Sequence, residues 1–271
     1  MRPLAEFPLE DRRAIRGVFF DIDDTLTSDG KLTAEAYCAL ERLHCAGLLA
    51  VPITGRPAGW CDHIARMWPI AGVVGENGAL YFRYDRTTRR MTRQFVDPPQ
   101  TRLRNRTRLE AIARHIVKAI PGSAIAADQA YRETDLAIDF SEDVPRLPDS
   151  AVDAIAALMF ERGLTVKVSS IHVNGWFGTY DKLTMTKRLV AECHAIDLDA
   201  EQRTFAFVGD SPNDVPLFEY FTHAIGVANV GEFGSRIVHE PAYVTRERCG
   251  KGFREVADCI LAATQPTHSQ P

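Results

Sequence analysis

The stretch GVFFDIDDTLT, residues 17–27, joins a short apolar run to a group of three aspartates. The apolar residues 17–20 are typical of a strand covered on both faces, and Asp21, Asp23 and Asp24 follow at its carboxyl end. Carboxylates this close repel one another, so the grouping is unfavourable unless a cation neutralises it or the site uses the charge. Asp21 and Asp23 are two residues apart, and an extended backbone presents both on the same side. The stretch therefore predicts a charged site at the mouth of a buried strand.

Apolar runs of the same kind recur along the chain and alternate with segments of helical spacing. The further runs predict strands at 48–54, 71–78, 204–210, 223–229 and 242–245. The helical segments are 32–46, which Thr33 opens as the N-cap, 58–67, 182–195, 212–221 and 252–263. Strands that alternate with helices predict a parallel sheet in a three-layer α/β domain.

The middle of the chain has a different order of elements. Residues 81–100 predict a basic hairpin and a Pro-marked linker, after which the segments read helix, strand, strand, helix, strand, strand. This αββαββ order, with helices at 104–120 and 149–162, is that of a self-contained sheet with helices on one face. We therefore predict an inserted α+β domain at 84–178 and a discontinuous α/β domain made of 1–83 and 179–271. The terminal residues 264–271 are predicted to be disordered.

Composition excludes several classes of function. The chain has 271 residues, 45% hydrophobic and 25% charged, with a formal net charge of −4, which provides no general field for a polyanion and predicts no nucleic-acid partner. No apolar run is long enough for a signal peptide or a membrane span, so we expect a cytoplasmic protein with no membrane partner. The six cysteines are widely spaced and form no C-x-x-C pair, which predicts neither a zinc site nor a disulfide framework.

Polar residues that end three of the predicted strands are expected to meet in one crevice. In open α/β sheets, ligands bind beyond the carboxyl ends of the strands, where Asp21, Thr54-Gly55-Arg56 and Asp210 stand. Carboxylate, carbonyl and water oxygens there would make the hard site that Mg²⁺ prefers. A calcium loop of the EF-hand type is excluded, because Leu26 and Leu32 occupy the positions that require glycine and glutamate.

Four segments resemble the motifs of the haloacid dehalogenase superfamily of phosphatases, in the order of that family. They are DIDDT at 21–25, Thr54 within PITGRP, the lysine of YDKLTMTKRL and GDSPND at 209–214. The inserted αββαββ segment and GENGA at 75–79 resemble the Cof-type, or type IIB, branch, which includes sucrose and mannosylphosphoglycerate phosphatases and phosphomannomutases. The resemblance extends from about Ile15 to Leu261 and implies a three-layer Rossmann-like core with an inserted cap.

The resemblance also implies roles for the residues that match the motifs. Asp21 would be the nucleophile that forms an aspartyl-phosphate, and Asp23 the general acid and base. Thr54, the amide of Gly55 and Lys182 would bind the transferring phosphoryl group. Arg56, directly after this turn, is a further candidate for contact with the substrate.

The implied cofactor is Mg²⁺, held by Asp21, the backbone oxygen of Asp23 and Asp210. Asn213 and Asp214 would orient the lysine and the water shell of the metal. This places Asn213 with the phosphate-binding residues and Asp214 with the metal residues.

Two departures from the family pattern concern the third aspartate and the lysine segment. Asp24 stands where the family often has glycine. Its carboxylate either points into a surface pair, which we favour, or adds negative charge around the site. The lysine segment reads K-L-T-M-T where K-G-x-A-L is common, so Lys187 competes with Lys182 for the phosphate-binding role.

In the insert, four residues are candidates either for contact with the substrate or for a structural role: Arg132, His172, Asn174 and Trp176.

Together these features predict a Mg²⁺-dependent phosphatase that hydrolyses a small phosphorylated metabolite, a sugar or polyol phosphate, beneath a mobile cap. A phosphomutase of the phosphomannomutase type is the alternative, because it shares the nucleophile. A non-catalytic protein that binds a phosphorylated metabolite is a further alternative. The expected partner is the small substrate alone, and the expected state is a monomer or homodimer.

Overall fold

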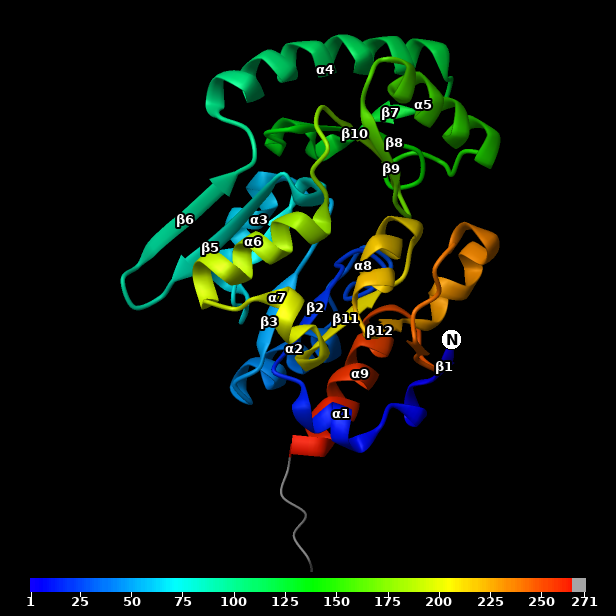
Figure 1. Cartoon of the computed structure of the whole chain (residues 1–271). Helices are drawn as coiled ribbons and strands as arrows, with labels where there is room; N and C mark the ends of the chain where they lie inside the picture. Colours follow the sequence, from blue (N-terminus) through cyan, green and yellow to red (C-terminus); the bar gives the residue numbers. More distant parts are fainter. Residues whose placement is uncertain (265–271) are drawn as a thin grey trace, which may run out of the picture. The chain divides into compact units, whose positions relative to one another are not determined.

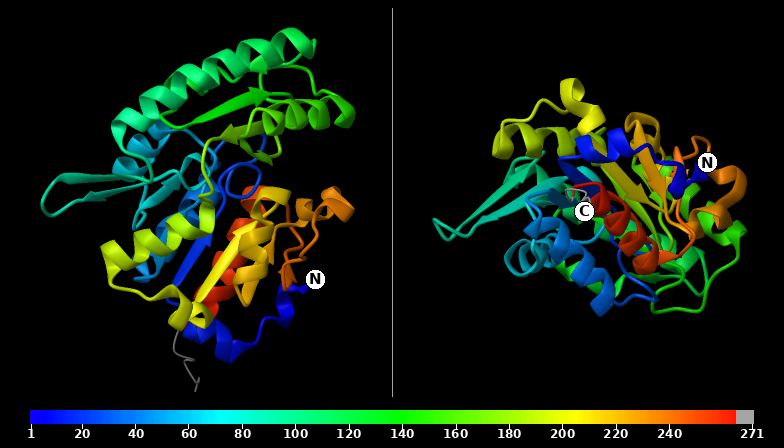
Figure 2. Two further views of the ribbon diagram at one scale, coloured as in Figure 1. Left: turned by 45° about the horizontal axis from the view of Figure 1, so that its top comes forward. Right: turned by 90° about the horizontal axis from the view of Figure 1, so that it is seen from below.

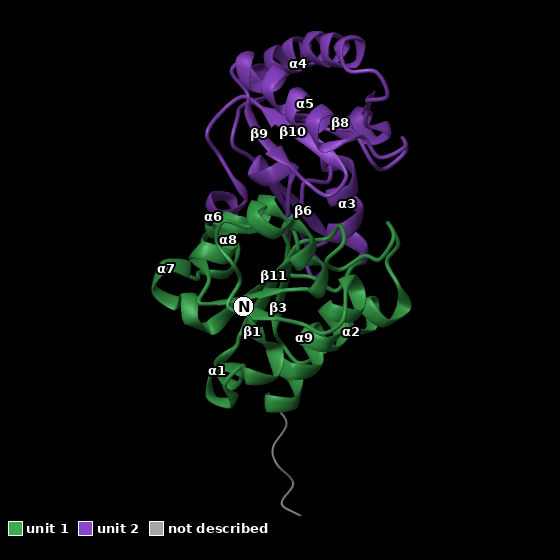
Figure 3. Ribbon diagram, turned by 90° about the vertical axis from the view of Figure 1, so that its right-hand side faces the viewer, with its two compact units in different colours: residues 1–53, 68–72, 187–271 green, residues 54–67, 73–186 purple. Residues whose placement is uncertain are grey.

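The computed structural model describes residues 1–264, which form two compact units (Figure 3). Unit 1 contains residues 1–53 and 68–72 and the described chain from 187 onward, and unit 2 contains residues 54–67 and 73–186. The disorder predicted for the C-terminal tail concerns residues that lie almost entirely outside the described chain. Among residues 1–264, no helix combines the length and apolar character that crossing a bilayer requires.

Unit 1 is built on a parallel sheet, as the alternation of strands and helices predicts (Figure 1). Its strand order in the described chain is β1-β13-β12-β11-β2-β3, and every neighbouring pair is parallel. The strands are β1 (Arg2–Pro3), β2 (Gly17–Phe20), β3 (Leu49–Pro52), β11 (Phe205–Gly209), β12 (His223–Gly226) and β13 (Tyr243–Val244). The fold class predicted for this part of the chain is confirmed.

Alternate residues of β2 serve the two faces of the sheet. Val18 and Phe20 join the apolar cluster formed with α2 (Ala34–Cys45) and α9 (Cys249–Thr264), and the ring of Phe20 packs against Phe253. Figure 2 shows α9, in red, alongside the strands. Phe19 faces the other way and packs against Phe221, which directly follows α8 (Val215–Tyr220). Both faces of β2 are therefore covered, which explains its unbroken apolar sequence.

The other helices of unit 1 are α1 (Leu9–Ala14), α7 (Leu198–Glu201) and the C-terminal part of α6 (Lys182–His194). The Thr33 hydroxyl caps α2 by accepting a hydrogen bond from the amide of Ala36, as predicted.

One predicted strand belongs elsewhere. The prediction that 71–78 joins the parallel sheet is wrong: β4 (Val73–Gly75) pairs antiparallel with β5 (Leu80–Asp85), which pairs with β6 (Arg90–Phe95). The cause is a turn at Glu76–Gly78 with φ values of 44°, 56° and 102°, which reverses the chain after β4. Gly78 is required there, because a Cβ would lie 1.9 Å from the carbonyl oxygen of Asp181.

Unit 2 also holds an antiparallel sheet of order β7-β8-β10-β9, accompanied by two helices. Its elements follow the predicted αββαββ order: α4 (Pro99–Ala119), β7 (Ala124–Ile125), β8 (Asp135–Asp139), α5 (Asp149–Glu161), β9 (Thr165–Val168) and β10 (His172–Trp176). Ile116 of α4 and Ile155 of α5 are fully buried in the apolar cluster that joins the helices to the strands.

Unit 2 contains the whole segment 84–178 that we predicted as the insert, together with residues 54–67, 73–83 and 179–186. The additional residues include α3 (Ala58–Met67), which packs on β5, so helix and hairpin group with this unit.

Candidate active site

Asp21 is fixed at the end of β2 by the ladder of the parallel sheet. Its amide donates to the carbonyl of Val208 at 2.9 Å, and the residue is only 4% exposed. The chain then turns, because the Ile22 carbonyl accepts hydrogen bonds from the amides of Leu26 and Thr27, both at 2.9 Å. The strand and this turn together place Asp21 in a buried position at the carboxyl edge of the sheet.

The turn explains why Asp24 can replace the usual glycine. Its φ is 56°, in the left-handed region that glycine adopts freely and that aspartate tolerates better than most residues. The Asp24 amide donates to the Thr27 hydroxyl at 3.2 Å, and its carbonyl accepts from Asn229 Nδ2 at 2.9 Å. The main chain of Asp24 thus ties the turn to a distant segment, whatever the direction of its side chain.

Asp210 lies at the end of β11 and is held by hydrogen bonds at both of its carboxylate oxygens. Thr25 Oγ1 donates to Oδ1 at 3.0 Å and Asn229 Nδ2 donates to Oδ2 at 3.0 Å. Ser211 and Asp214 form a capping box at the start of the following helical turn, and Asp214 Oδ2 also accepts from the Asp210 amide at 3.1 Å. The segment GDSPND is therefore a rigid turn that presents two carboxylates from one end.

Three carboxylates of unit 1 converge at the carboxyl ends of β2 and β11. Ligand oxygens of Asp21, Asp210 and Asp214, all buried, lie within 4.8 Å of one another. Burial, followed by the charges of Asp214 and Asp21, raises the pKa of Asp210 well above its usual range. An all-oxygen group of buried carboxylates fits a hard divalent cation such as Mg²⁺, which would relieve the repulsion. Asp23 is half-buried and its carboxylate is not part of this group.

Thr54, Gly55 and Arg56 form a tight turn at the start of unit 2. The Thr54 amide donates to the Val74 carbonyl at 2.9 Å, and the Arg56 amide donates to Thr54 Oγ1 at 3.0 Å. A Cβ at Gly55 would lie 3.2 Å from Asn77 Oδ1, so the turn has little room for a larger residue. This geometry is that of a small loop whose hydroxyl and amides can address an anion.

The structure distinguishes the two candidate lysines. Lys182 is buried, and it is the first residue of α6. Lys187 Nζ instead pairs with Asp199 Oδ1 at 2.7 Å and lies 4.4 Å from the ring centroid of Tyr220. These contacts of Lys187 favour Lys182 as the phosphate-binding lysine.

Asn213, the remaining predicted phosphate-binding residue, is buried, and its Oδ1 accepts a hydrogen bond from Ser211 Oγ at 2.7 Å.

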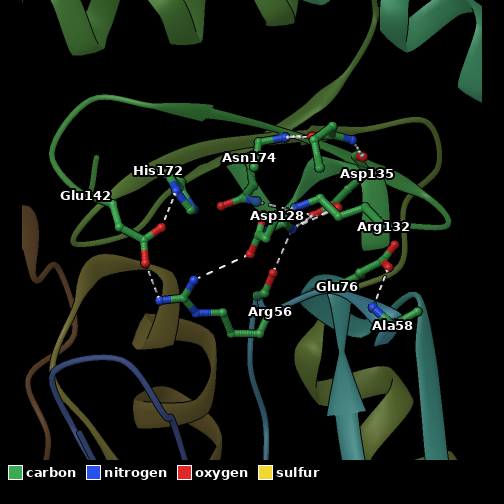
Figure 4. A network of polar contacts seen from close by, with 12 residues as sticks. Arg56, Ala58, Glu76, Asp128, Arg132, Asp135, Glu142, His172 and Asn174 are labelled. Atoms are coloured by element: carbon green, nitrogen blue, oxygen red, sulfur yellow. Dashed lines mark hydrogen bonds and ion pairs between the residues drawn. The ribbon is translucent and has the colours of Figure 1, made fainter. Parts of the chain in front are cut away.

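Arg56 is paired with acids of the predicted insert (Figure 4). Its Nη2 donates to Glu142 Oε1 at 2.7 Å, and its Nη1 lies 3.4 Å from Asp128 Oδ2. His172 Nε2 lies 3.0 Å from the other Glu142 oxygen. Burial alone would raise the pKa of Glu142, but the contacts with His172 and Arg56 lower it to about 2. Arg56 is thus neutralised within its own unit.

The other candidate residues of the insert have buried partners. Asn174 Nδ2 and the Arg132 guanidinium both donate to the carboxylate of Asp135 (Figure 4). Trp176 is buried and stacks on Tyr180 with ring centroids 5.7 Å apart. The sequence left open whether these side chains contact the substrate or have a structural role. Their buried contacts support a structural role.

A pH-dependent contribution to stability follows from the Glu142 contacts. Its pKa is lowered from 4.5 to about 2, so the stabilisation is fully present above pH 4.5 and is lost as the pH falls through 2. At pH 7 we expect Glu142→Gln to lower the free energy of unfolding by about 2 kcal/mol, which is less than the shift alone implies because Glu142 is partly exposed. Urea denaturation of both proteins at several pH values measures this difference. A difference that stays constant down to pH 3 would contradict the assignment.

The structure assigns the predicted site residues to the two units as follows. Asp21, Asp23, Asp210, Asn213 and Asp214 belong to unit 1, and Thr54, Gly55, Arg56 and Lys182 belong to unit 2. Sequence reasoning missed five residues that support them: Thr25, Glu76, Asp128, Glu142 and Asn229. Thr25 stands inside DIDDT and Glu76 inside GENGA, so both carried a signal, whereas the other three stand in no recognisable motif.

Comparison with known proteins gives consistent relatives. The profile of the haloacid dehalogenase-like hydrolases matches residues 18–97. Phosphoglycolate phosphatase 1 of Saccharolobus solfataricus is 24% identical over 253 residues, which cover 91% of this chain and 96% of that protein. Phosphoglycolate phosphatase of Methanothrix thermoacetophila is 25% identical over 254 residues, covering 92% and 98%. The C-terminal domain of C. albicans trehalose-6-phosphate phosphatase shares the fold, with a TM-score of 0.69 at 13% identity and coverage of 94% and 95%.

Proposed function

We propose that the chain is a Mg²⁺-dependent phosphatase of the haloacid dehalogenase-like hydrolases, whose profile matches residues 18–97, and that it hydrolyses a small phosphorylated metabolite through an aspartyl-phosphate. The observation that carries this proposal is the group of three buried carboxylates, Asp21, Asp210 and Asp214, at the ends of two adjacent parallel strands. Such a group is costly unless a cation occupies it, and a nucleophilic aspartate beside a divalent cation is suited to phosphoryl transfer.

In the proposed reaction, an oxygen of Asp21 attacks phosphorus, and the bond from phosphorus to the leaving oxygen breaks. Asp23 gives its proton to that oxygen, and the alcohol departs. Asp23 then accepts a proton from water as the water oxygen attacks the phosphorus of the aspartyl-phosphate. The bond to Asp21 breaks and inorganic phosphate leaves. Bound Mg²⁺ would neutralise charge on the phosphoryl oxygens, with Asp21, Asp210 and the backbone of Asp23 as its ligands and Asp214 orienting its water.

Thr54, the amide of Gly55, Lys182 and Asn213 are proposed to bind and orient the phosphoryl group. The Thr54 hydroxyl accepts a hydrogen bond from the Arg56 amide. The hydrogen of that hydroxyl can therefore be donated to a phosphoryl oxygen. Lys182 would add a positive charge against the same oxygens. Preorganised donors of this kind supply the largest part of the barrier reduction in many enzymes.

For the substrate we propose a sugar or polyol phosphate. Arg56 and Arg132, which could otherwise bind a second anionic group, are both paired with carboxylates inside unit 2. Glu142 remains ionised beside the phosphate-binding turn, where it would accept hydrogen bonds from hydroxyl groups and repel a carboxylate. The names of the curated relatives favour 2-phosphoglycolate as the second candidate.

Phosphate release by the purified chain tests the function and the substrate together. We expect hydrolysis of an aryl phosphate with Mg²⁺ and loss of that hydrolysis with EDTA. We also expect kcat/KM to be at least about tenfold higher for glucose 6-phosphate or trehalose 6-phosphate than for 2-phosphoglycolate, which corresponds to about 1.4 kcal/mol of discrimination. Preference for 2-phosphoglycolate would support the second candidate. Interconversion of hexose 1- and 6-phosphates without phosphate release would indicate a mutase, and binding without turnover would overturn the enzymatic proposal.

A further inference from the structure

The backbone of the turn at 54–58 is hydrogen-bonded to two other segments of unit 2, residues 76–77 and Arg132. The Thr54 carbonyl accepts from the Asn77 amide at 3.2 Å, and the Arg56 carbonyl accepts from the Glu76 amide at 3.1 Å. The Ala58 amide donates to Glu76 Oε1 at 2.8 Å. A short loop next to glycine would otherwise sample several conformations. Its conformation is therefore set by residues outside the loop.

Arg132 completes this support through a side chain. Its Nη1 donates to the Gly55 carbonyl at 2.8 Å, and the amide on the far side of that peptide unit, that of Arg56, donates to Thr54 Oγ1. The peptide between Gly55 and Arg56 is thus fixed at both ends. Because the Arg56 amide is held in place, its hydrogen bond also fixes the position of Thr54 Oγ1.

The Arg132 guanidinium is itself locked by two buried carboxylates (Figure 4). Its Nε donates to Asp128 Oδ1 at 3.1 Å, and its Nη1 donates to Asp135 Oδ1 at 3.0 Å. Asn77 Nδ2 donates to Asp135 Oδ2 at 3.1 Å, so the same residue that supports Thr54 also supports the partner of Arg132. A planar guanidinium offers five N–H donors in a fixed fork, here directed at two carboxylates and a carbonyl, and the compact ammonium of a lysine does not reproduce that geometry.

The Glu76 carboxylate links the turn at 54–58 to residues 133–134. In addition to the hydrogen bond from the Ala58 amide, it accepts hydrogen bonds from the amides of Glu133 and Thr134, at 2.8 and 2.7 Å, and from the Thr134 hydroxyl. All of these partners are donors, and only a group that accepts at both oxygens satisfies them. Glu76 has a φ of 44°, an uncommon value for a glutamate, which persists because its surroundings determine it.

We propose that Glu76 and Arg132 are positioning residues of the phosphate-binding turn, holding it so that the Thr54 hydroxyl and the Gly55 amide face the phosphoryl oxygens. This inference rests on the proposed function and adds to it two residues that need not touch the substrate. They act through the Gly55 carbonyl and the Ala58 amide. Loss of either would let the turn relax, and misplacement of about 1 Å can reduce a rate about 10²-fold.

The test compares Arg132→Met, Arg132→Lys and Glu76→Gln with a core variant of the same unit. Arg132→Lys keeps the positive charge against Asp128 and Asp135, which guards against a failure to fold. Glu76→Gln keeps the volume but sets an amide donor against backbone donors. Ile116→Ala is the control, because Ile116 is fully buried in the apolar cluster of α4 and α5 and is not part of the turn.

We expect the positioning variants to lower kcat for an aryl phosphate by about 10²-fold and to raise the Ki of inorganic phosphate about tenfold. Ile116→Ala should lower Tm and leave both constants within about twofold, when assayed well below its Tm. Folded positioning variants that keep the wild-type kcat and Ki would overturn the inference. Inactivity of the wild type would overturn the proposed function instead, and calorimetric titration of every variant with inorganic phosphate would still test the positioning of the turn.

Discussion

Asp21→Asn is expected to lower kcat for an aryl phosphate by about 10⁴-fold or more while the protein stays folded. The amide cannot attack phosphorus as a carboxylate oxygen does, so the first displacement stops. The asparagine side chain can still occupy the place of the carboxylate at the end of β2. The hydrogen bond from the backbone amide of residue 21 to the Val208 carbonyl is unaffected. The loss should appear in kcat, measured by phosphate release at saturating substrate and Mg²⁺.

Thermal melting separates loss of the nucleophile from loss of the fold. Without Mg²⁺, Asp21→Asn should melt at or above the wild-type temperature, because one of three mutually repelling carboxylates becomes neutral. Asp29→Asn is the matched control, since Asp29 is exposed in the same segment and asparagine tolerates its φ of 49°. The control should keep full activity. A folded Asp21→Asn protein as active as the wild type would rule out the aspartyl-phosphate mechanism.

Asp210→Asn is expected to be more stable than the wild type without Mg²⁺ and less stable than the wild type with saturating Mg²⁺. Burial and the neighbouring Asp214 and Asp21 disfavour the charged form of Asp210 and raise its pKa, so the neutral variant should be more stable than the wild type without metal at pH 7. An asparagine can still accept from Asn229 and donate to the Thr25 hydroxyl. The expected gain is about 1–2 kcal/mol in the free energy of unfolding.

Mg²⁺ should then stabilise the wild type by about 2.7 kcal/mol at a concentration 100 times its Kd, and the variant by much less. Urea denaturation with EDTA and with saturating Mg²⁺ measures both differences, and Asp29→Asn should respond to Mg²⁺ as the wild type does. Equal stabilisation of the wild type and Asp210→Asn by Mg²⁺ would mean that this carboxylate does not hold the metal.

The sequence predicted the acidic half of the site because its geometry follows from local rules. Short apolar runs that end in Asp21 and Asp210 became neighbouring parallel strands, so their carboxyl ends meet at one edge of the sheet. The αββαββ order was also accessible, since helix-like and strand-like segments follow one another in that order along the sequence. Strand β1 was not predictable, because two residues within a mixed-charge segment show no period at all.

The ion pairs of Arg56 could not be predicted from the sequence. Arg56 meets Asp128 and Glu142, which are 72 and 86 residues further along the chain, and no pattern of sequence joins them. Ion pairs between such distant residues depend on the packing of the finished unit. The antiparallel pairing of β4 was hidden for a related reason: a three-residue run fits either kind of sheet, and the turn at Glu76–Gly78 decides between them.

The hairpin of β5 and β6 has a consequence for how the protein behaves at high concentration. Strand β6 stands at one end of its three-stranded sheet, and such a strand offers backbone groups to which a strand of another molecule can add. Arg90 is exposed on this strand, and Arg86 and Arg89 are exposed in the turn before it. A second hairpin approaching in register would bring arginine opposite arginine. The run of positive charge therefore protects an open border of the molecule against strand-by-strand aggregation.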